Sequence, residues 1–373
     1  HLAPDIAKLA TNDHPYGYGK QLLAQRRYCE EALGLTALAA EISFSPLPAD
    51  SAENSGRTWQ KRFGEVEASK AQEAVAQAVQ EHADACGERA TELKAWLNSL
   101  KGDGRAAFLH ATPKRWAKLL SGPQLEFAMR RLLRLPLPGL AGARCSCGAA
   151  IDADGDHADV CPHQHGERHN RHFHVNVHAV QAPARQAKLS PKPEVPDLVE
   201  DTNGRPADTG IMEHHEFGHG VVACYDVVGC GTCAPTYVET AARYAGGAWE
   251  RAVATKLRNA RRLRPSAGRE LVVIPMAFES QGAMHPNWRA TYESWAHRWA
   301  TLGEGRSRRD EGALVRCWVA QASMAIQRAQ YFLVRRMREL AESCAHGGQP
   351  HAWRSPDIDD VDAQRVHCPP LEG

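Results

Sequence analysis

The sequence predicts a mixed protein of the α/β class (α+β overall), in which a helical N-terminal region precedes a mixed sheet flanked by helices. Two apolar runs rich in β-branched residues, 221–228 and 271–278, have the character of strands, and the stretch 237–262 between them favours a helix. The run 66–100 also favours a helix, because it is rich in alanine, glutamate and glutamine. Between residues 141 and 178 the composition changes abruptly to cysteine, histidine, aspartate and arginine.

The composition excludes some classes of protein. The chain has 373 residues, of which 43% are hydrophobic, so it has enough apolar material for folded cores. Its longest apolar run covers eight residues and includes Pro275, whereas a membrane-spanning helix needs roughly 20, so we expect no membrane partner. The eleven cysteines are an odd number and mostly scattered, which favours reduced thiols and an intracellular location. Because the chain begins with His1, we expect a fragment of a longer protein.

The organisation along the chain suggests five segments. A basic amphipathic helix is expected at 123–135, where Pro136 ends it, and another at 311–343, while 183–206 favours a loop or a short helix. The expected segments are a helical linker region 1–140, the cysteine- and histidine-rich segment 141–178, a sheet domain 179–300, a C-terminal helix 301–343 and a loose tail 344–373.

The cysteine- and histidine-rich segment has the spacing of a zinc knuckle, C-x-C-x9-H-x3-C. The predicted ligands are Cys145, Cys147, His157 and Cys161, and Gly148 permits the tight turn after the first pair. Three thiolates and one imidazole complete a tetrahedral zinc site with no open position, so we predict a structural role. The alternative is four unrelated residues in a chain with many cysteines.

Six histidines follow the predicted knuckle between residues 163 and 178. They can form a solvated face or a second metal site, or they can lie on a basic helix that faces nucleic acid. We choose the last interpretation and predict that Arg168 and Arg171 contact phosphates. The pair Cys230 and Cys233 has no matching second pair, and its simplest interpretation is a turn with two free thiols.

His215, Glu216 and His219 form a literal H-E-x-x-H motif, which is typical of zinc metalloproteases when it lies on a helix. Here Gly218 disfavours a helix, and the β-branched run 221–228 follows immediately. We therefore favour a polar turn between two strands and keep the protease as an alternative.

Two aspartates have the placement of a magnesium site. Asp208 belongs to the stretch 205–208 that opens the first expected strand, and Asp226 lies inside the run 221–228, where burying an unpaired carboxylate is unfavourable. Two such carboxylates on paired strands can share Mg(II), which prefers oxygen ligands. Lys256, on the following helix, can project its ammonium into the same cleft. The alternative is one solvated and one hydrogen-bonded aspartate with no shared role.

A basic run surrounds Lys256 and contains no acidic residue. Its arginines are Arg251, Arg258, Arg261, Arg262, Arg264 and Arg269. We predict a phosphate-binding face that includes Arg258, Arg261 and Arg262, although a merely solvated basic helix is the alternative. The net charge of the whole chain is only +1, so such a face would be local.

Taken in order, these motifs resemble the C-terminal region of non-LTR retrotransposon polyproteins. The resemblance covers roughly residues 107–340 and includes the basic helix, the knuckle, Arg168 with His169, Asp208, Asp226 and Lys256, and the stretch Phe278, Glu279 and Ser280. In that family a reverse transcriptase is followed by a zinc knuckle and a restriction-like endonuclease of the PD-(D/E)XK class. Ala207 separates Pro206 from Asp208, and Val228 stands where the motif has its usual lysine.

The resemblance implies a metal-dependent endonuclease that nicks target DNA for integration. It implies Asp208 and Asp226 as magnesium ligands and Lys256 as the catalytic lysine, whereas it gives Glu279 no role. The expected partners are a DNA target, the RNA of the element and the reverse transcriptase domain of the same polyprotein, in the nucleus. An alternative keeps the fold as a nucleic-acid-binding module with an inactive nuclease site. The chain has no polymerase motif of the Tyr-x-Asp-Asp type.

Overall fold

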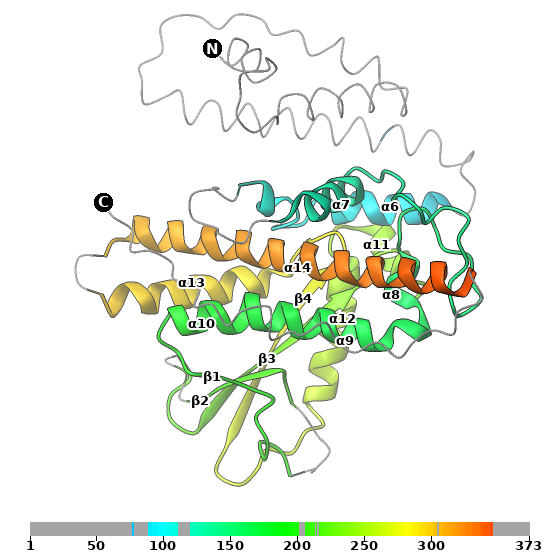
Figure 1. Cartoon of the computed structure of the whole chain (residues 1–373). Coiled ribbons are helices and arrows are strands. Elements are labelled where there is room, and N and C mark those ends of the chain that lie inside the picture. The colour runs from blue at the N-terminus through cyan, green and yellow to red at the C-terminus, as the bar shows by residue number, and fades with distance from the viewer. Residues whose placement is uncertain are drawn as a thin grey trace, which may run out of the picture. The chain divides into compact units, whose positions relative to one another are not determined.

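A computed structural model of the chain describes Gln77 and residues 89–110, 120–200, 206–212, 214, 216–303 and 306–345. All of them belong to one compact unit, residues 72–373. Within this part the fold is mixed α/β, as the sequence predicts (Figure 1). Most of the helix expected at 66–100 lies outside the described residues, as do His215 and the tail beyond Ala345.

The described strands form one mixed four-stranded sheet in the order β1-β2-β3-β4. The strands are β1 (Pro191–Pro193), β2 (Thr209–Met212), β3 (Val221–Cys230) and β4 (Glu270–Glu279). The first three pair antiparallel, whereas β3 and β4 are parallel along their whole length. The two long strands confirm the runs 221–228 and 271–278. The sequence did not predict β1, because its two prolines disfavour a strand except at a sheet edge, where β1 lies.

The parallel strands β3 and β4 are joined by a helical crossover. It consists of α11 (Val238–Arg243) and α12 (Gly247–Ala260), so the single helix expected at 237–262 is interrupted. Gly246, at the start of α12, has φ 85°, which disfavours any residue with a Cβ atom. A Cβ at Gly247 would run into the carbonyl of Thr240, so the break depends on this glycine pair. The crossover brings α12 back to lie against β3 and β4.

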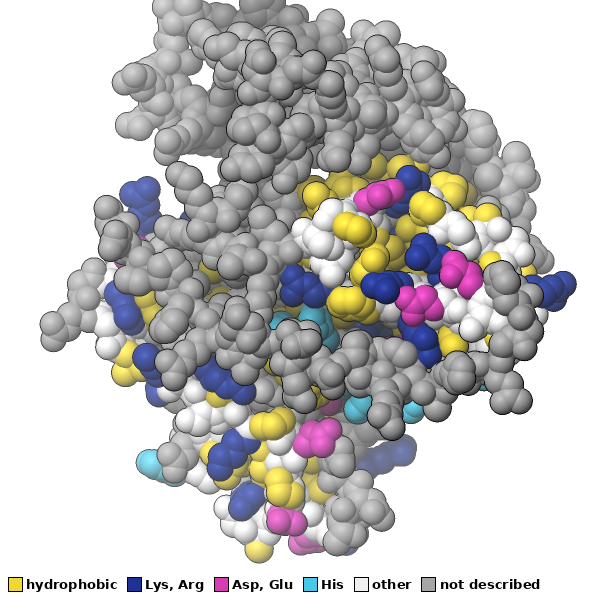
Figure 2. Space-filling model, viewed as in Figure 1, with side chains coloured by type: hydrophobic (Ala, Val, Ile, Leu, Met, Phe, Trp, Pro, Cys, Tyr) yellow, Lys and Arg dark blue, Asp and Glu magenta, His cyan; other side chains and the backbone are white. Residues whose placement is uncertain are grey.

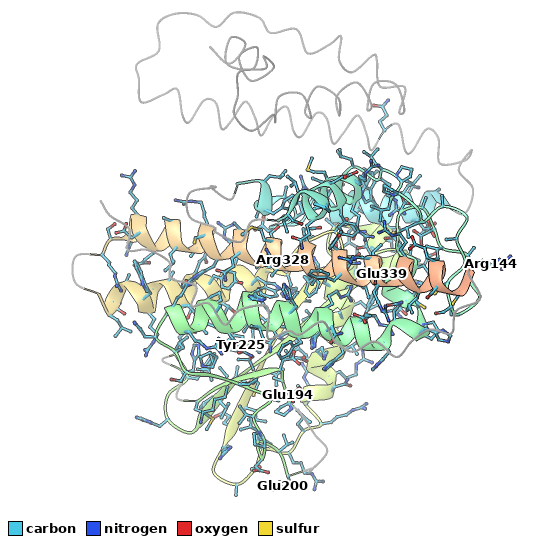
Figure 3. All side chains as sticks on the ribbon, viewed as in Figure 1. Arg144, Glu194, Glu200, Tyr225, Arg328 and Glu339 are labelled. Atoms are coloured by element: carbon cyan, nitrogen blue, oxygen red, sulfur yellow. The ribbon has the colours of Figure 1, made fainter. Side chains whose placement is uncertain are left out.

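One face of the sheet packs against helices and forms the main core. Tyr225 and Met276 from the sheet meet Trp295 of α13 (Pro286–Thr301) and Trp318 of α14 (Arg308–Ala345), and all four are almost fully buried. Tyr225, labelled in Figure 3, has its ring 5.2 Å from that of Trp295 at a steep angle. The short helix α10 (Ala182–Gln186) contributes to the same core. The helix expected at 311–343 is thereby confirmed.

A second core lies around the cysteine- and histidine-rich segment. Phe127 of α7 (Gly122–Leu132) packs there with Ala158 of α8 (His157–Val160) and with Leu333 of α14. Helix α9 (His165–Val175) follows and packs against α14, and α6 (Arg89–Ser99) packs against α11. The helix expected at 123–135 is thus confirmed. Because α14 has 38 residues and reaches both cores, it joins the second core to the sheet core.

The surface of the described part mixes charges of both signs. Figure 2 shows lysine and arginine side chains interspersed with acidic ones on the face in view. Among the described residues, no helix combines the length and apolar character needed to cross a membrane.

Candidate metal centres

The four predicted knuckle ligands come together in one cluster. Their ligand atoms all lie within 4.8 Å of one another. The Sγ atoms of Cys145 and Cys161 are 3.4 Å apart, and Sγ of Cys147 is 3.3 Å from Nε2 of His157. Three sulfurs and one imidazole nitrogen at such separations match the donor set and size of a tetrahedral site for Zn(II).

Local backbone structure positions these four side chains. Gly148 has φ 88°, and its N–H donates to the carbonyl of Cys145 over 2.8 Å, which forms the tight turn expected after the first cysteine pair. The short helix α8 carries His157 and leads to Cys161, whose N–H donates to the carbonyl of His157 over 2.9 Å. Burial raises the pKa of Cys161 to about 12, so this sulfur stays a thiol unless a cation stabilises its thiolate.

Three aspartates beside this cluster also approach one another, but internal partners already engage them. Both carboxylate oxygens of Asp152 accept backbone N–H groups, at distances from 2.7 to 3.1 Å. Arg134 lies 3.1 Å from the carboxylate of Asp154 and 2.6 Å from that of Asp156, and Arg131 pairs with Asp156 at 3.2 Å. Their role is therefore to hold the segment onto the end of α7 rather than to bind a second cation.

Asp208, Asp226 and Lys256 converge on a second point of the molecule. Nζ of Lys256 lies 2.9 Å from Oδ1 and 2.8 Å from Oδ2 of Asp226. Asp208 immediately precedes β2, and its Oδ2 accepts the N–H of Val227 over 2.7 Å. The three residues come from separate elements, and the crossover that returns α12 to the sheet is what brings Lys256 to Asp226.

The structure adds His172, which the sequence interpretation did not assign to this site. Its Nε2 lies 3.1 Å from Oδ2 of Asp208 and also contacts the carbonyl of Val227. The ligand atoms of His172, Asp208 and Asp226 all lie within 4.8 Å of one another. No spacing rule signals His172, because α9 lies far from both aspartates in the sequence and one of its partners is a backbone carbonyl.

Burial and charge set the protonation of this cluster. Burial raises the pKa of Asp226, and the charge of Asp208 acts in the same direction, whereas the ammonium of Lys256 lowers it. Burial lowers the pKa of His172, but its hydrogen bond to Asp208 and the charges of both aspartates outweigh this effect, so the pKa is raised overall. A carboxylate disfavoured by burial and by a like charge gains stability from a bound cation, so the cluster fits a hard divalent metal.

Of the two arginines on α9 that were predicted to contact phosphates, Arg171 is buried and Arg168 is partly exposed. Arg171 is 6% exposed, and its guanidinium pairs with Asp159 and lies 2.8 Å from Oε1 of Gln330 on α14. So little of Arg171 is exposed that it cannot contact a phosphate, and the prediction that it does so is wrong. Arg168 donates to the carbonyl of Cys161 over 2.5 Å and is partly exposed. The sequence interpretation of Arg171 failed because Gln330 lies far away in the chain.

The predicted basic face on α12 is exposed. Arg258, Arg261 and Arg262 are all exposed at the end of this helix, and none forms an ion pair with another described residue. Arg258 lies on the same helix as Lys256, which is 35% exposed, and Arg261 and Arg262 follow the end of this helix directly. The position of this run therefore allows it to contact a polyanion that also reaches the carboxylates.

Glu279 lies apart from both clusters. It ends β4, pairs in register with Cys230 and is 1% exposed, and its Oε2 has no hydrogen-bond partner among the described residues. Burial raises the pKa of Glu279 to about 8. The residue is therefore a buried, neutral carboxyl group at neutral pH and not a ligand of the carboxylate cluster.

The described part of the H-E-x-x-H stretch and the pair of Cys230 and Cys233 both lie at the ends of strands. Glu216 and His219 lie in the turn that joins β2 to β3, as expected, and His215 lies outside the described residues. No metal-ligand group among the described residues includes Glu216 or His219, and the described part of the motif is a turn and not the helix that a metalloprotease needs. Cys230 and Cys233 are free thiols in and after the end of β3.

Comparison of the chain with protein-family models, with curated proteins and with solved structures gives no match.

Proposed function

We propose that this chain is a metal-dependent DNA endonuclease of the restriction-like PD-(D/E)XK type, carried with a zinc knuckle in a retrotransposon polyprotein. One observation carries the proposal. Asp208, Asp226 and Lys256, selected in the sequence from three separate elements, meet at one point, with Nζ of Lys256 2.8 Å from Asp226. An accidental set of one solvated and one hydrogen-bonded aspartate would not require a lysine from the crossover helix at the same place.

In this proposal Asp208 and Asp226 hold the catalytic metal. Mg(II) bound there would supply a Lewis acid for the scissile phosphate and its attacking water. Lys256 keeps its ammonium beside Asp226, where it can orient that water or stabilise the charge that develops on the phosphate. Arg258, Arg261 and Arg262 bind the DNA backbone next to this point. The product is a nick with a 3′-hydroxyl.

The Cys145, Cys147, His157 and Cys161 cluster holds structural zinc in this proposal. Its complete donor set leaves no open position for catalysis. The segment can therefore support a binding surface for the DNA target or for the RNA of the element. The reverse transcriptase domain of the same polyprotein would extend the 3′-hydroxyl, in the nucleus.

The test uses the purified chain, supercoiled plasmid DNA and Mg(II), with nicked circles as the product. Asp208→Asn and Asp226→Asn keep the shape of each side chain but remove its charge, so each should reduce nicking to background while DNA binding survives. Glu216→Gln should nick like the wild type, because Glu216 lies in the β2–β3 turn. Equal nicking by Asp226→Asn would refute the assignment. DNA binding by a wild-type chain that never nicks would favour the inactive module instead.

A further inference from the structure

Strand β3 extends beyond the end of its neighbour β2, and the carboxylate cluster lies at this point. Thr209, the first residue of β2, pairs with Tyr225, and the N–H of Asp208 donates to the carbonyl of Tyr225 over 3.1 Å. Strand β3 continues to Cys230, so the N–H and C=O of Val227 on this edge have no partner on β2. Val227 is fully buried, and a buried peptide group without a hydrogen-bond partner destabilises the fold.

Two side chains replace the missing strand at Val227. Oδ2 of Asp208 accepts the N–H over 2.7 Å, and Nε2 of His172 contacts the C=O. A carbonyl oxygen can only accept a hydrogen bond, so this contact is a hydrogen bond only when Nε2 carries the proton. Nε2 of His172 also lies 3.1 Å from Oδ2 of Asp208, so the proton on Nε2 lies between these two acceptors. In this arrangement Nε2 is a donor and has no free lone pair for a cation.

The residue one turn further on holds the backbone of the same aspartate. Asn176 is 4% exposed, and its Nδ2 donates to the carbonyl of Asp208 over 3.3 Å. Its Oδ1 accepts the hydroxyl of Thr209 over 2.8 Å. Asn176 begins a π-helical segment, residues 176–181, that follows α9 directly. His172 of α9 therefore contacts the side chain of Asp208, and Asn176, at the start of the π-helical segment that follows, holds its backbone.

Helix α9 is itself firmly placed beside β3 (Figure 1). The buried guanidinium of Arg171, next to His172, joins α9 to Gln330 of α14 and lies 5.9 Å from the ring centre of Phe278 on β4. Because α9 contacts both helix α14 and strand β4, it can fix the orientation of Asp208 more tightly than a loop can.

We propose that His172 is a positioning residue for Asp208, which it orients through a proton on Nε2. The proposal rests on the endonuclease function proposed above. The hydrogen bonds to Val227 and His172 engage Oδ2 of Asp208, whereas Oδ1 has no hydrogen-bond partner among the described residues. His172 thus presents Oδ1 for the cation and does not itself bind it.

The experiment compares His172→Ala with His172→Gln, because the glutamine amide can supply a donor in place of Nε2 but cannot act as an imidazole ligand. His172→Ala should weaken Mn(II) binding, measured by electron paramagnetic resonance, and slow nicking, each by about 10- to 100-fold, the usual effect of losing a residue that orients a ligand. His172→Gln should recover most of both, with KM for DNA unchanged. Phe173→Ala, at a residue of α9 that is 41% exposed, is the matched control and should behave like the wild type.

Two results of this comparison would overturn the proposal. If His172→Ala bound Mn(II) as tightly as the wild type, His172 would have no role in positioning Asp208. If His172→Gln bound Mn(II) as weakly as His172→Ala, the imidazole itself would be a metal ligand. A separate readout does not depend on cleavage. Imidazole ¹⁵N spectra of the metal-free protein at alkaline pH should contain an Nε2–H signal that His172→Gln lacks. An Nδ1–H form would contradict the proposal, whereas a wild type without nicking or Mn(II) binding would contradict only the endonuclease function.

Discussion

The two metal-ligand clusters are built in opposite ways. The Cys/His cluster takes all its ligands from one short segment, Cys145 to Cys161, whereas the carboxylate cluster draws on α9, the start of β2 and β3, with Lys256 from α12. In both, the ligand atoms lie within 4.8 Å. A local cluster can form as its segment folds around an ion, but a dispersed one exists only after the sheet and its helices have packed.

This contrast predicts different responses to loss of a ligand. The local cluster should depend on its metal for its fold, since a short segment builds little core alone. The dispersed cluster should keep its fold when one ligand is changed, because the sheet core, with Trp295 and Trp318, holds the elements in place.

The largest effect is expected from removing zinc. Structural zinc contributes roughly 10–16 kcal/mol in small zinc domains, so a chelator or Cys161→Ser should unfold the residues around Cys145 to Cys161. Hydrogen exchange should show reduced protection there and in the part of α14 that packs on this core, with the sheet retained. Cys344→Ser, near the end of α14, is the control and should change nothing. A chelated protein with full protection around Cys145 would break the comparison.

A smaller effect is expected from the buried carboxyl group of Glu279. Its pKa is about 8 in the folded protein against an ordinary 4.5, so the unfolded chain loses this proton first as pH rises. Stability should be undiminished below pH 4.5, fall between 4.5 and 8, and be lower by up to roughly 5 kcal/mol above 8. In urea unfolding, Glu279→Gln should remove this fall and be the more stable protein in alkali.

The control for Glu279 lies at the other end of the same strand. Glu270 is exposed, so Glu270→Gln should keep the wild-type dependence of stability on pH. An equally steep dependence in Glu279→Gln would mean that another group loses the proton.

Lys256→Ala should be milder than loss of either aspartate, because a single donor to a transition state contributes about 3 kcal/mol, or roughly 100-fold in rate. Single-turnover nicking measures this loss. Thr255→Ala changes the preceding exposed residue and should leave the rate unchanged. A Lys256→Ala rate equal to that of Asp226→Asn would mean that the lysine maintains the cluster itself rather than assisting the reaction.

The smallest effect concerns Arg258, Arg261 and Arg262. Replacing all three with glutamine should reduce the slope of log affinity for DNA against log salt by about 0.9 for each phosphate that these arginines neutralise. Arg335→Gln with Arg338→Gln, whose guanidiniums pair with acids on α14, is the matched control and should keep the slope. An unchanged slope in the triple variant would mean that these arginines do not contact DNA.

The sequence by itself determined what depends on near neighbours. The spacing of Cys145 to Cys161 identified the Cys/His cluster, and β-branched runs identified β3 and β4, because turn geometry and strand propensity act over a few residues. Asp226 could be singled out for a similar reason, since a carboxylate in an apolar strand needs a partner.

Only the tertiary structure decided which distant groups those side chains meet. It placed Lys256 on Asp226, put His172 and Asn176 around Asp208, and turned Arg171 inward to Gln330. A hydrogen bond or ion pair between packed elements depends on distance in space. No local pattern encodes that distance when one partner is a backbone carbonyl or a residue from another helix.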